Sequence, residues 1–174
     1  MDVEQLKIDV DFMLQALKEA QAAAEEGEVP VGCVIVAEEG GVSSSGKKTS
    51  AGKGRAVSVS QGRIIARAHN LTETLNDPTA HAEMQAITSA SAYLGGKYLD
   101  KCTLYVTVEP CPMCAAALNW AQVGRVVYGC DDPKRGASKF SPTLYHPKTV
   151  VQGGILDKEC SKIMTDFFSR KRKR

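Results

Sequence analysis

The sequence predicts an α/β protein in which helices cover both faces of a central, mixed, five-stranded sheet, a three-layer α/β/α sandwich. Segments with helical periodicity alternate along the chain with short apolar or alternating segments typical of strands. The length of 174 residues favours a single domain, 1–174, large enough to form a core without disulfide bonds. Its 43% hydrophobic and 24% charged residues are ordinary for a globular protein.

The first helix and the first strand follow from two different patterns. Apolar residues recur every three or four positions near the N-terminus, at Leu6, Val10, Met13, Leu17, Ala20 and Ala24. This spacing predicts a helix, and Gly27 follows as a typical C-terminal stop. The run VPVGCVIVA, residues 29–37, is rich in β-branched residues and too apolar for a surface strand. It therefore predicts a strand at the centre of the sheet.

The composition changes between residues 40 and 62. The segment GGVSSSGKKTSAGKGRAVSVSQG holds six glycines, six serines and four Lys or Arg residues, with no acidic residue. This composition indicates a flexible, basic insertion in a hairpin loop. A loop this long in a compact domain is either disordered or used, so a tolerated linker and a nucleic-acid contact are both open.

The remaining chain alternates strands with helices. The expected strands are 63–70, 102–109, 125–130 and, within the irregular segment 131–154, a short strand at 149–151. Expected helices cover 80–94, closed by Gly95 and Gly96, and 111–124. A last helix places on one face Cys160, Ile163, Met164, Phe167 and Phe168.

Charge and hydropathy suggest a cytoplasmic protein without a membrane segment. No apolar run approaches the roughly 20 residues that a membrane helix needs. The acidic, amphipathic N-terminus is unlike a signal or transit peptide. The net charge is only +2, but residues 170–174 are five consecutive basic residues. This basic tail is either simply solvated or a contact for phosphate groups.

The six cysteines fall into two groups. Four lie in apolar or periodic runs, where a free cysteine acts as a small core residue: Cys33, Cys102, Cys130 and Cys160. Cys111 and Cys114 differ, because Pro110 and Pro112 accompany them at the predicted start of a helix. At positions i and i+3 their side chains share one face, and a helix N-terminus favours the thiolate form. This pair alone fits either a metal site or a redox site.

An upstream histidine favours the metal site. In PTAHAEMQ, His81 and Glu83 open the preceding helix, which should begin at the same sheet edge as the helix at Cys111. One imidazole and two thiolates give zinc three ligands and leave a fourth position open, which is typical of catalytic zinc. The two other histidines, His69 and His146, are isolated and expected to be structural or peripheral.

Glu83 has two interpretations. A glutamate in the first turn of a helix often only complements the helix dipole. Beside a metal that lowers the pKa of bound water to about 7, the same carboxylate is a candidate proton shuttle. Its place between His81 and the cysteine pair favours the second interpretation.

The motifs resemble a known enzyme family. His-Ala-Glu followed by Pro-Cys-x-x-Cys resembles the signature of the zinc-dependent nucleobase deaminases. The strings EVPVGCVIV, AHN, DPTAHAE, LYVTVEPCPMCAAAL, GRVVYG, GIL and DFF are similar to those of bacterial tRNA-specific adenosine deaminases. The resemblance runs from about Glu28 to Phe168, outside the insertion, and implies a cytidine-deaminase-like fold.

The resemblance also implies a reaction and its residues. It implies one zinc ion per subunit on His81, Cys111 and Cys114, with zinc-bound hydroxide attacking C6 of the wobble adenosine of an arginine tRNA. Glu83 would protonate N1 and then the leaving amine, giving inosine and ammonia. Two positions match pocket residues: Asn70 and Val31. Three match contacts with the tRNA anticodon stem-loop: Asp132, Lys134 and Phe168.

Family members are usually homodimers, so Leu118 and Trp120 belong either to a subunit interface or to the core. The chain also departs from the family: the insertion is long, Asp131 replaces a common arginine, and 146–154 is shortened. Two other functions stay open. One is deamination of a free base or nucleotide, such as guanine or cytosine, and the other is a non-catalytic zinc or redox module.

Overall fold

The computed structural model describes residues 2–38, 62–141 and 144–172. A five-stranded sheet lies at its centre, in the order β2-β1-β3-β4-β5. Its strands are β1 (Gly32–Ala37), β2 (Arg63–His69), β3 (Cys102–Val108), β4 (Arg125–Cys130) and β5 (Val150–Gln152). β1 runs antiparallel to β2 and β3, whereas β3, β4 and β5 are parallel. The predicted mixed sheet is confirmed.

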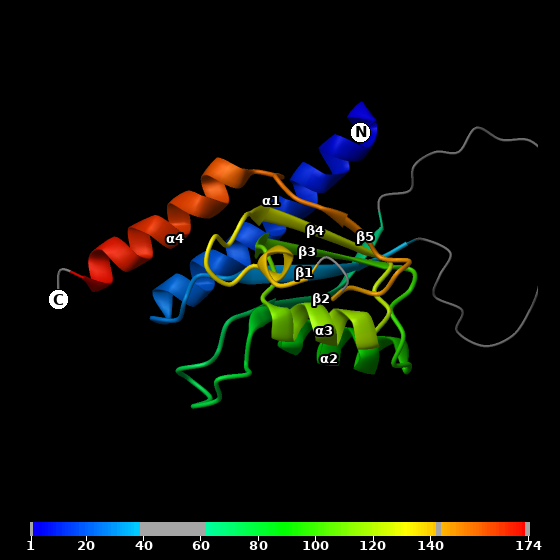
Figure 1. Cartoon of the computed structure of the whole chain (residues 1–174), viewed down its shortest axis with the longest axis horizontal. Coiled ribbons are helices and arrows are strands. Elements are labelled where there is room, and N and C mark those ends of the chain that lie inside the picture. Colours follow the sequence, from blue (N-terminus) through cyan, green and yellow to red (C-terminus); the bar gives the residue numbers. More distant parts are fainter. Residues whose placement is uncertain (1, 39–61, 142–143, 173–174) are drawn as a thin grey trace, which may run out of the picture.

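Four helices form the outer layers, as Figure 1 shows. On one face α1 (Val3–Glu25) packs on β1 and β3, and α4 (Asp157–Lys171) on β4. On the other face α2 (Ala82–Leu94) packs on β1 and β2 beside α3 (Pro112–Trp120). A single 3-10 turn, η1 (Ala137–Lys139), follows β4. The three-layer α/β/α sandwich predicted from the sequence is therefore confirmed.

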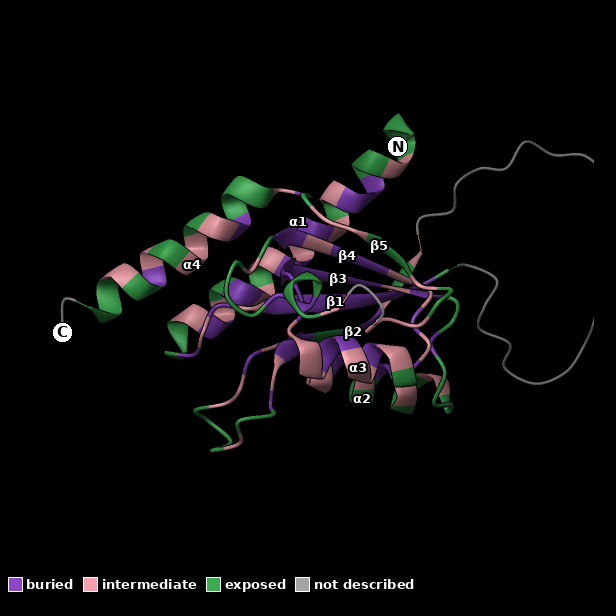
Figure 2. Cartoon of the chain, viewed as in Figure 1, coloured by how far each residue is buried: buried purple, intermediate pink, exposed green. Residues whose placement is uncertain are grey.

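Alternate residues of β1 pack into two separate cores. Cys33, Ile35 and Ala37 point into the core beneath α2, whereas Val34 and Val36 point into the core beneath α1 and α4. All six residues of β1 are buried, and the centre of the sheet is mainly purple in Figure 2. The four cysteines predicted to be core residues are all buried and free. An all-apolar central strand is thus explained by burial on both faces.

Two predicted boundaries differ from the observed ones by three or more residues. β1 begins at Gly32 rather than at residue 29, because Val31 N–H bonds Val29 C=O at 2.8 Å in a tight turn around Pro30. α3 ends at Trp120 rather than at Gly124. Gln122 has a φ of 52°, and Val123 donates back to the Leu118 carbonyl at 3.1 Å, which ends the helix.

Glycine ends two helices as expected. Gly95 caps α2 with a φ of 64°, and Gly27, with a φ of 81°, follows α1. The insertion 40–62 joins the antiparallel neighbours β1 and β2 and lies, except for Gly62, outside the described residues. The last two residues of the basic tail also lie outside them. In the described parts of the chain, every helix is too short or too polar to cross a membrane.

A buried ion pair ties α1 to the sheet. The Arg125 guanidinium on β4 donates to both carboxylate oxygens of Asp9, at 2.6 and 2.7 Å. The Tyr105 hydroxyl on β3 and the Gln5 amide donate to the same carboxylate, at 2.9 and 3.0 Å. Burial raises the pKa of Asp9, but these hydrogen bonds outweigh it and hold that pKa below 3.8. A fully buried carboxylate on α1 is thereby satisfied from two strands.

Candidate metal centre and active site

The N-termini of α2 and α3 meet at one edge of the sheet. β2 and β3 point the same way, because both run antiparallel to β1, and each is followed by one of these helices. His81 is the N-cap of α2 and Cys111 is the N-cap of α3, both with extended backbone. Pro112 occupies the first turn of α3, where its missing N–H costs nothing. Two residues distant in sequence are thus brought together at helix starts.

These two helix starts assemble the predicted ligand group. The His81 Nδ1 atom lies 3.7 Å from the Cys111 sulfur and 3.5 Å from the Cys114 sulfur. All three ligand atoms lie within 4.8 Å of one another. Around a tetrahedral zinc with bonds of about 2.0–2.3 Å, ligand atoms are roughly 3.5–3.8 Å apart. One nitrogen and two sulfur donors at this spacing fit zinc without rearrangement of the backbone.

Hydrogen bonds within the group shift the pKa values of its members in different directions. Hydrogen bonds from Cys114, chiefly, and from His81 together lower the pKa of Cys111 to about 4, against the effect of burial. The hydrogen bond between the two cysteines and burial raise the pKa of Cys114. The hydrogen bond to Cys111 raises the pKa of His81. Zinc binding needs both cysteines as thiolates and His81 as a neutral imidazole, so it displaces the protons that remain on the group.

Glu83 is buried beside this group. Its side chain lies in the first turn of α2 and the residue is 3% exposed. Burial raises the pKa of its carboxyl more than the charge of His81 and the neighbouring Cys114 thiol lower it. A residue that only complemented the helix dipole would be expected at the surface. The structure therefore places a carboxyl next to the metal ligands, as the shuttle interpretation requires.

Asn70 and Val31 lie together where β2 ends. The Asn70 N–H donates to the Val31 carbonyl at 3.0 Å, and the next residue, Leu71, donates to the Ala80 carbonyl at 3.0 Å. Ala80 directly precedes His81, so this second bond fixes Asn70 close to the start of α2. Asn70 is 5% exposed, and Val31 packs against both cores.

The loop after β4 carries two predicted RNA contacts. The Asp132 carboxylate accepts from the Lys134 and Arg135 backbone N–H groups, both at 2.9 Å, so it shapes its own turn. Lys134 is exposed. The Glu109 carboxylate, which directly precedes the Pro-Cys pair, accepts from the Asp132 N–H at 3.2 Å and the Ser138 N–H at 3.0 Å. This loop is thereby fastened beside Cys111.

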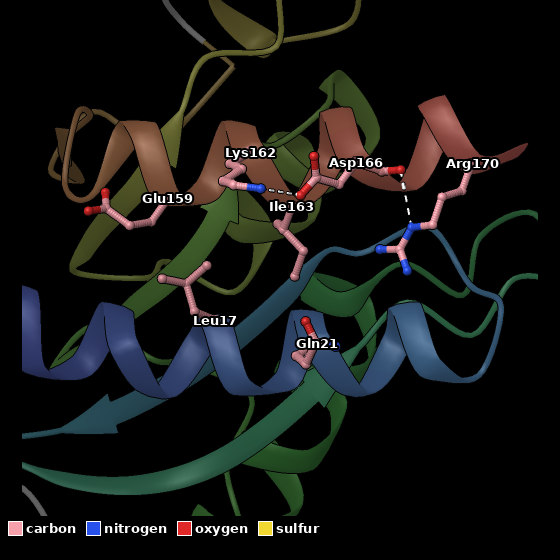
Figure 3. Close-up of a pocket in the computed structure, with 7 residues that line it drawn as sticks. All are labelled: Leu17, Gln21, Glu159, Lys162, Ile163, Asp166 and Arg170. Carbon is pink, nitrogen blue, oxygen red and sulfur yellow. Dashed lines mark hydrogen bonds and ion pairs between the residues drawn. The ribbon is translucent and has the colours of Figure 1, made fainter. Parts of the chain in front are cut away.

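Phe168 lies on a different layer from the metal ligands. It is 40% exposed on α4 and packs edge-on against the buried Phe167, with ring centroids 5.3 Å apart. A hollow between α1 and α4, shown in Figure 3, is lined by Leu17, Gln21, Glu159, Lys162, Ile163, Asp166 and Arg170. The hollow lies across the sheet from α2 and α3 and contains none of the ligands. Phe168 is therefore available at the surface but is not part of the metal site.

The two remaining histidines are peripheral, as expected. His69 Nε2 lies 3.1 Å from a carboxylate oxygen of Glu26, next to α1. His146 Nδ1 accepts from the Lys148 N–H at 3.2 Å in an exposed turn. Neither residue belongs to the ligand group, so the described chain supplies three protein ligands there.

Three residues near the site had no predicted role. Glu28 and Glu109 are buried carboxylates that accept hydrogen bonds from loop backbone. The Tyr145 hydroxyl is buried and has no hydrogen-bond partner among the described residues. Burial, then the charges of Glu109 and Glu83, raise the pKa of Tyr145, which places it near the site. Within the described ranges, this buried hydroxyl is left for a ligand or a water molecule to satisfy.

Comparison with known proteins defines the class. Residues 6–130 match the profile of the cytidine and deoxycytidylate deaminase zinc-binding region. The chain belongs to this family of zinc-dependent deaminases. Its fold, its His-Cys-Cys group and the predicted zinc cofactor agree with that membership.

Within the family, the chain is similar to enzymes that act on tRNA. It is 40% identical over 168 residues to the tRNA-specific adenosine deaminase of Bacillus subtilis (strain 168), covering 94% of this chain and 90% of the relative. A structure solved in a study of A-to-I editing by tRNA:A34 deaminases is 39% identical, with a TM-score of 0.70, and the match covers 88% and 98% of the two chains.

The same fold also occurs with another substrate. The guanine deaminase of Nitrosomonas europaea has a TM-score of 0.72 but only 18% identity, and the match covers 92% of this chain and 84% of that chain. Such a likeness shows the fold alone. The fold is therefore compatible with more than one substrate, and substrate choice depends on the residues around the metal group.

Proposed function

We propose that this protein converts the wobble adenosine in the anticodon loop of a tRNA, an arginine tRNA in the first instance, to inosine. One observation carries the proposal. The His81, Cys111 and Cys114 group has a buried carboxyl, Glu83, beside it, in a chain 40% identical to a tRNA-specific adenosine deaminase. Metal ligands alone would fit any member of the family; the identity over 94% of the chain favours the tRNA substrate.

The chemistry is a hydrolytic exchange at C6 of adenine. Zinc, when held by His81, Cys111 and Cys114, supplies the Lewis acidity that activates a water molecule. Glu83 would take one proton from that water and deliver it to N1, and would then move the second proton, from the oxygen newly bonded to C6, to the departing 6-amino group. The oxygen of water becomes bonded to C6 while the bond between C6 and its nitrogen breaks, so water and adenosine give inosine and ammonia. Burial of Glu83 keeps its proton from exchanging freely with solvent.

Asn70 and Val31 are proposed to form the base pocket. They lie side by side at the end of β2, and the bond between Leu71 and Ala80 holds them next to the metal ligand His81. The carboxamide of Asn70 offers a polar contact to the base, and Val31 offers an apolar wall. An unpaired loop nucleotide costs little to unstack, so it can enter such a pocket.

The loop after β4 and the end of α4 are proposed to contact the anticodon stem-loop. Asp132 and Lys134 lie on a loop that borders the metal group, and the charge of the neighbouring Arg135 acts on His81. Phe168 is exposed and can stack on an unpaired base. Residues 170–174 add basic charge beyond it, suited to phosphates.

A homodimer in the cytoplasm completes this proposal. Leu118 is fully buried in the core of the subunit, whereas Trp120, on the same helix, is 85% exposed. An exposed tryptophan of this kind is typical of an interface, where a large amphipathic side chain contributes area. Sedimentation at micromolar concentration tests it: a dimer that Trp120→Ala weakens is expected, and a wild-type monomer would contradict it.

The proposed function is tested by measuring inosine in an arginine-tRNA stem-loop with adenosine at the wobble position. Zinc-loaded wild-type protein is compared with Glu83→Gln, and free adenine, guanine and cytosine serve as control substrates. Inosine at the wobble position, lost in the variant, is the expected result. Ammonia from a free base without any inosine would instead assign the protein to the small-molecule deaminases.

A further inference from the structure

Glu28 is a fully buried carboxylate just before β1. It accepts four hydrogen bonds from one connection, 70–74. The donors are the Asn70 amide nitrogen at 3.0 Å, the Thr72 hydroxyl at 3.4 Å, the Glu73 N–H at 3.1 Å and the Thr74 N–H at 2.7 Å. Among the described side chains, none forms an ion pair with Glu28. Its charge is therefore balanced by polar N–H and O–H groups alone.

These hydrogen bonds keep Glu28 ionised. Burial raises the pKa of its carboxyl, but the Thr74 and Glu73 backbone N–H groups and the hydroxyls outweigh burial and lower that pKa below 4.5. An ionised carboxylate only accepts hydrogen bonds. The atom of the Asn70 carboxamide that faces Glu28 must therefore be its nitrogen and not its oxygen.

The amide nitrogen of Asn70 has no hydrogen left to offer. One hydrogen goes to Glu28 at 3.0 Å and the other to the Thr72 hydroxyl oxygen, also at 3.0 Å. No hydrogen bond from a described residue reaches the carbonyl oxygen of Asn70. That oxygen is thus the one polar atom of the side chain available to a ligand.

We propose that Glu28 is a positioning residue that fixes the carboxamide of Asn70 so that its carbonyl oxygen accepts a hydrogen bond from the substrate nucleotide. This inference rests on the proposed function, which puts Asn70 in the base pocket. The ligand group is a hydrogen-bond donor, either an amino group of the base or a ribose hydroxyl. Glu28 acts on the substrate through Asn70, and none of its hydrogen bonds goes to a metal ligand.

The test exchanges the carboxylate and the amide group between positions 28 and 70. Asn70→Asp places a second carboxylate about 3 Å from Glu28, so the pair repels and we expect activity to fall by about tenfold to hundredfold. Adding Glu28→Gln supplies an amide that donates to the carboxylate introduced at position 70 and leaves the other oxygen of that carboxylate facing the pocket. We expect Glu28→Gln/Asn70→Asp to recover about tenfold over Asn70→Asp.

Two controls separate positioning from stability. Glu28→Gln leaves the Glu73 N–H facing an amide, so Tm and zinc content are measured for every variant. Glu109→Gln makes the same chemical change at the other buried loop-anchoring carboxylate, and combined with Asn70→Asp it should give no recovery. A Glu28→Gln/Asn70→Asp protein that is folded and zinc-loaded, yet no more active than Asn70→Asp, would overturn the proposal.

A modified substrate identifies the group that donates the hydrogen bond to Asn70. A stem-loop with 2′-deoxyadenosine at the target position lacks one ribose hydroxyl. If this substrate removes the effect of Asn70→Ala, the ribose hydroxyl is the donor. If the effect of Asn70→Ala persists, the amino group of the base is the donor.

Hydrogen exchange tests the orientation without any substrate. In the wild-type protein both side-chain amide hydrogens of Asn70 should exchange more slowly than those of the exposed Asn76, and Glu28→Gln should speed their exchange. Equal exchange at Asn70 and Asn76 would refute the arrangement. Because this readout needs no catalysis, it stands even if the protein acts on another base.

Discussion

Replacing Arg125 by methionine should lower the free energy of unfolding. It should also reverse the direction in which the contribution of Asp9 to that free energy changes with pH. Arg125 supplies two of the four hydrogen bonds to the fully buried Asp9 carboxylate; Tyr105 and Gln5 supply the others. Methionine keeps much of the packing volume but none of the charge. The substitution leaves a negative charge buried between α1 and the sheet with only two neutral donors.

The magnitude follows from that burial. Breaking a buried ion pair by removing one partner costs about 3–5 kcal/mol, because the remaining charge is uncompensated. In a chain of 174 residues this corresponds to a Tm lower by roughly 6–20 °C. Asp9→Asn should cost less, because the Arg125 side chain is 21% exposed and reaches water when its partner is lost.

The pH dependence has opposite signs in the two proteins. In the wild type the pKa of Asp9 is lowered below 3.8, so its contribution to stability is full above that pH and is lost as pH falls through the folded-state pKa. Without Arg125, burial is no longer outweighed and the pKa of Asp9 rises. In Arg125→Met the contribution of Asp9 is therefore present at acidic pH and lost as pH rises through the raised pKa.

Urea unfolding of wild type, Arg125→Met and Asp9→Asn at pH 5 and pH 7 measures both effects. We expect the deficit of Arg125→Met to be larger at pH 7, while the deficit of Asp9→Asn changes little. A loss of under about 1 kcal/mol for Arg125→Met at pH 7 would show that the pair behaves like an exposed one. An equal loss at both pH values would show that Asp9 stays ionised without its partner.

Three further outcomes follow from the site. Glu83→Gln should bind zinc with wild-type stoichiometry but lose about 100-fold or more in turnover, seen by metal analysis beside single-turnover deamination; unchanged turnover would remove Glu83 from the mechanism. Cys111→Ser should lose most of its zinc while keeping its circular dichroism, and retention of the metal would point to another ligand. Deleting residues 170–174 should weaken stem-loop binding and flatten its salt dependence, and an unchanged slope would show that this segment is merely solvated.

Local patterns were sufficient for the elements and for the metal group. The 3.6-residue and two-residue periodicities report which faces are buried, so the helices and strands could be read from the chain. The metal group could be predicted because its ligands lie in two short motifs, His81 in one and the cysteine pair in the other. The strand and helix boundaries at Gly32 and Trp120 were missed, because each depends on one backbone turn rather than on a repeated pattern.

Buried polar networks could not be predicted from the sequence. Glu28 binds backbone groups 45 and 46 residues away, and Arg125 meets Asp9 across 116 residues. In the sequence, a charged residue near a proline or within a helix gives the same pattern whether its side chain faces water or binds a distant backbone amide. Trp120 illustrates the converse, since its apolar neighbours gave no sign that it is 85% exposed. Such features depend on tertiary contacts that no short window contains.

Of the three metal ligands, Cys114 is fully buried, whereas His81 and Cys111 are only partly buried. Neither the cluster beneath α2 nor the one beneath α1 and α4 contains His81, Cys111 or Cys114. The sheet should accordingly persist when zinc is withdrawn, unlike small domains whose folding depends on the ion. In a cell short of zinc, this protein would then stay folded but inactive. Resupplied metal would restore activity without new synthesis, and cobalt could replace zinc as a coloured reporter of the site.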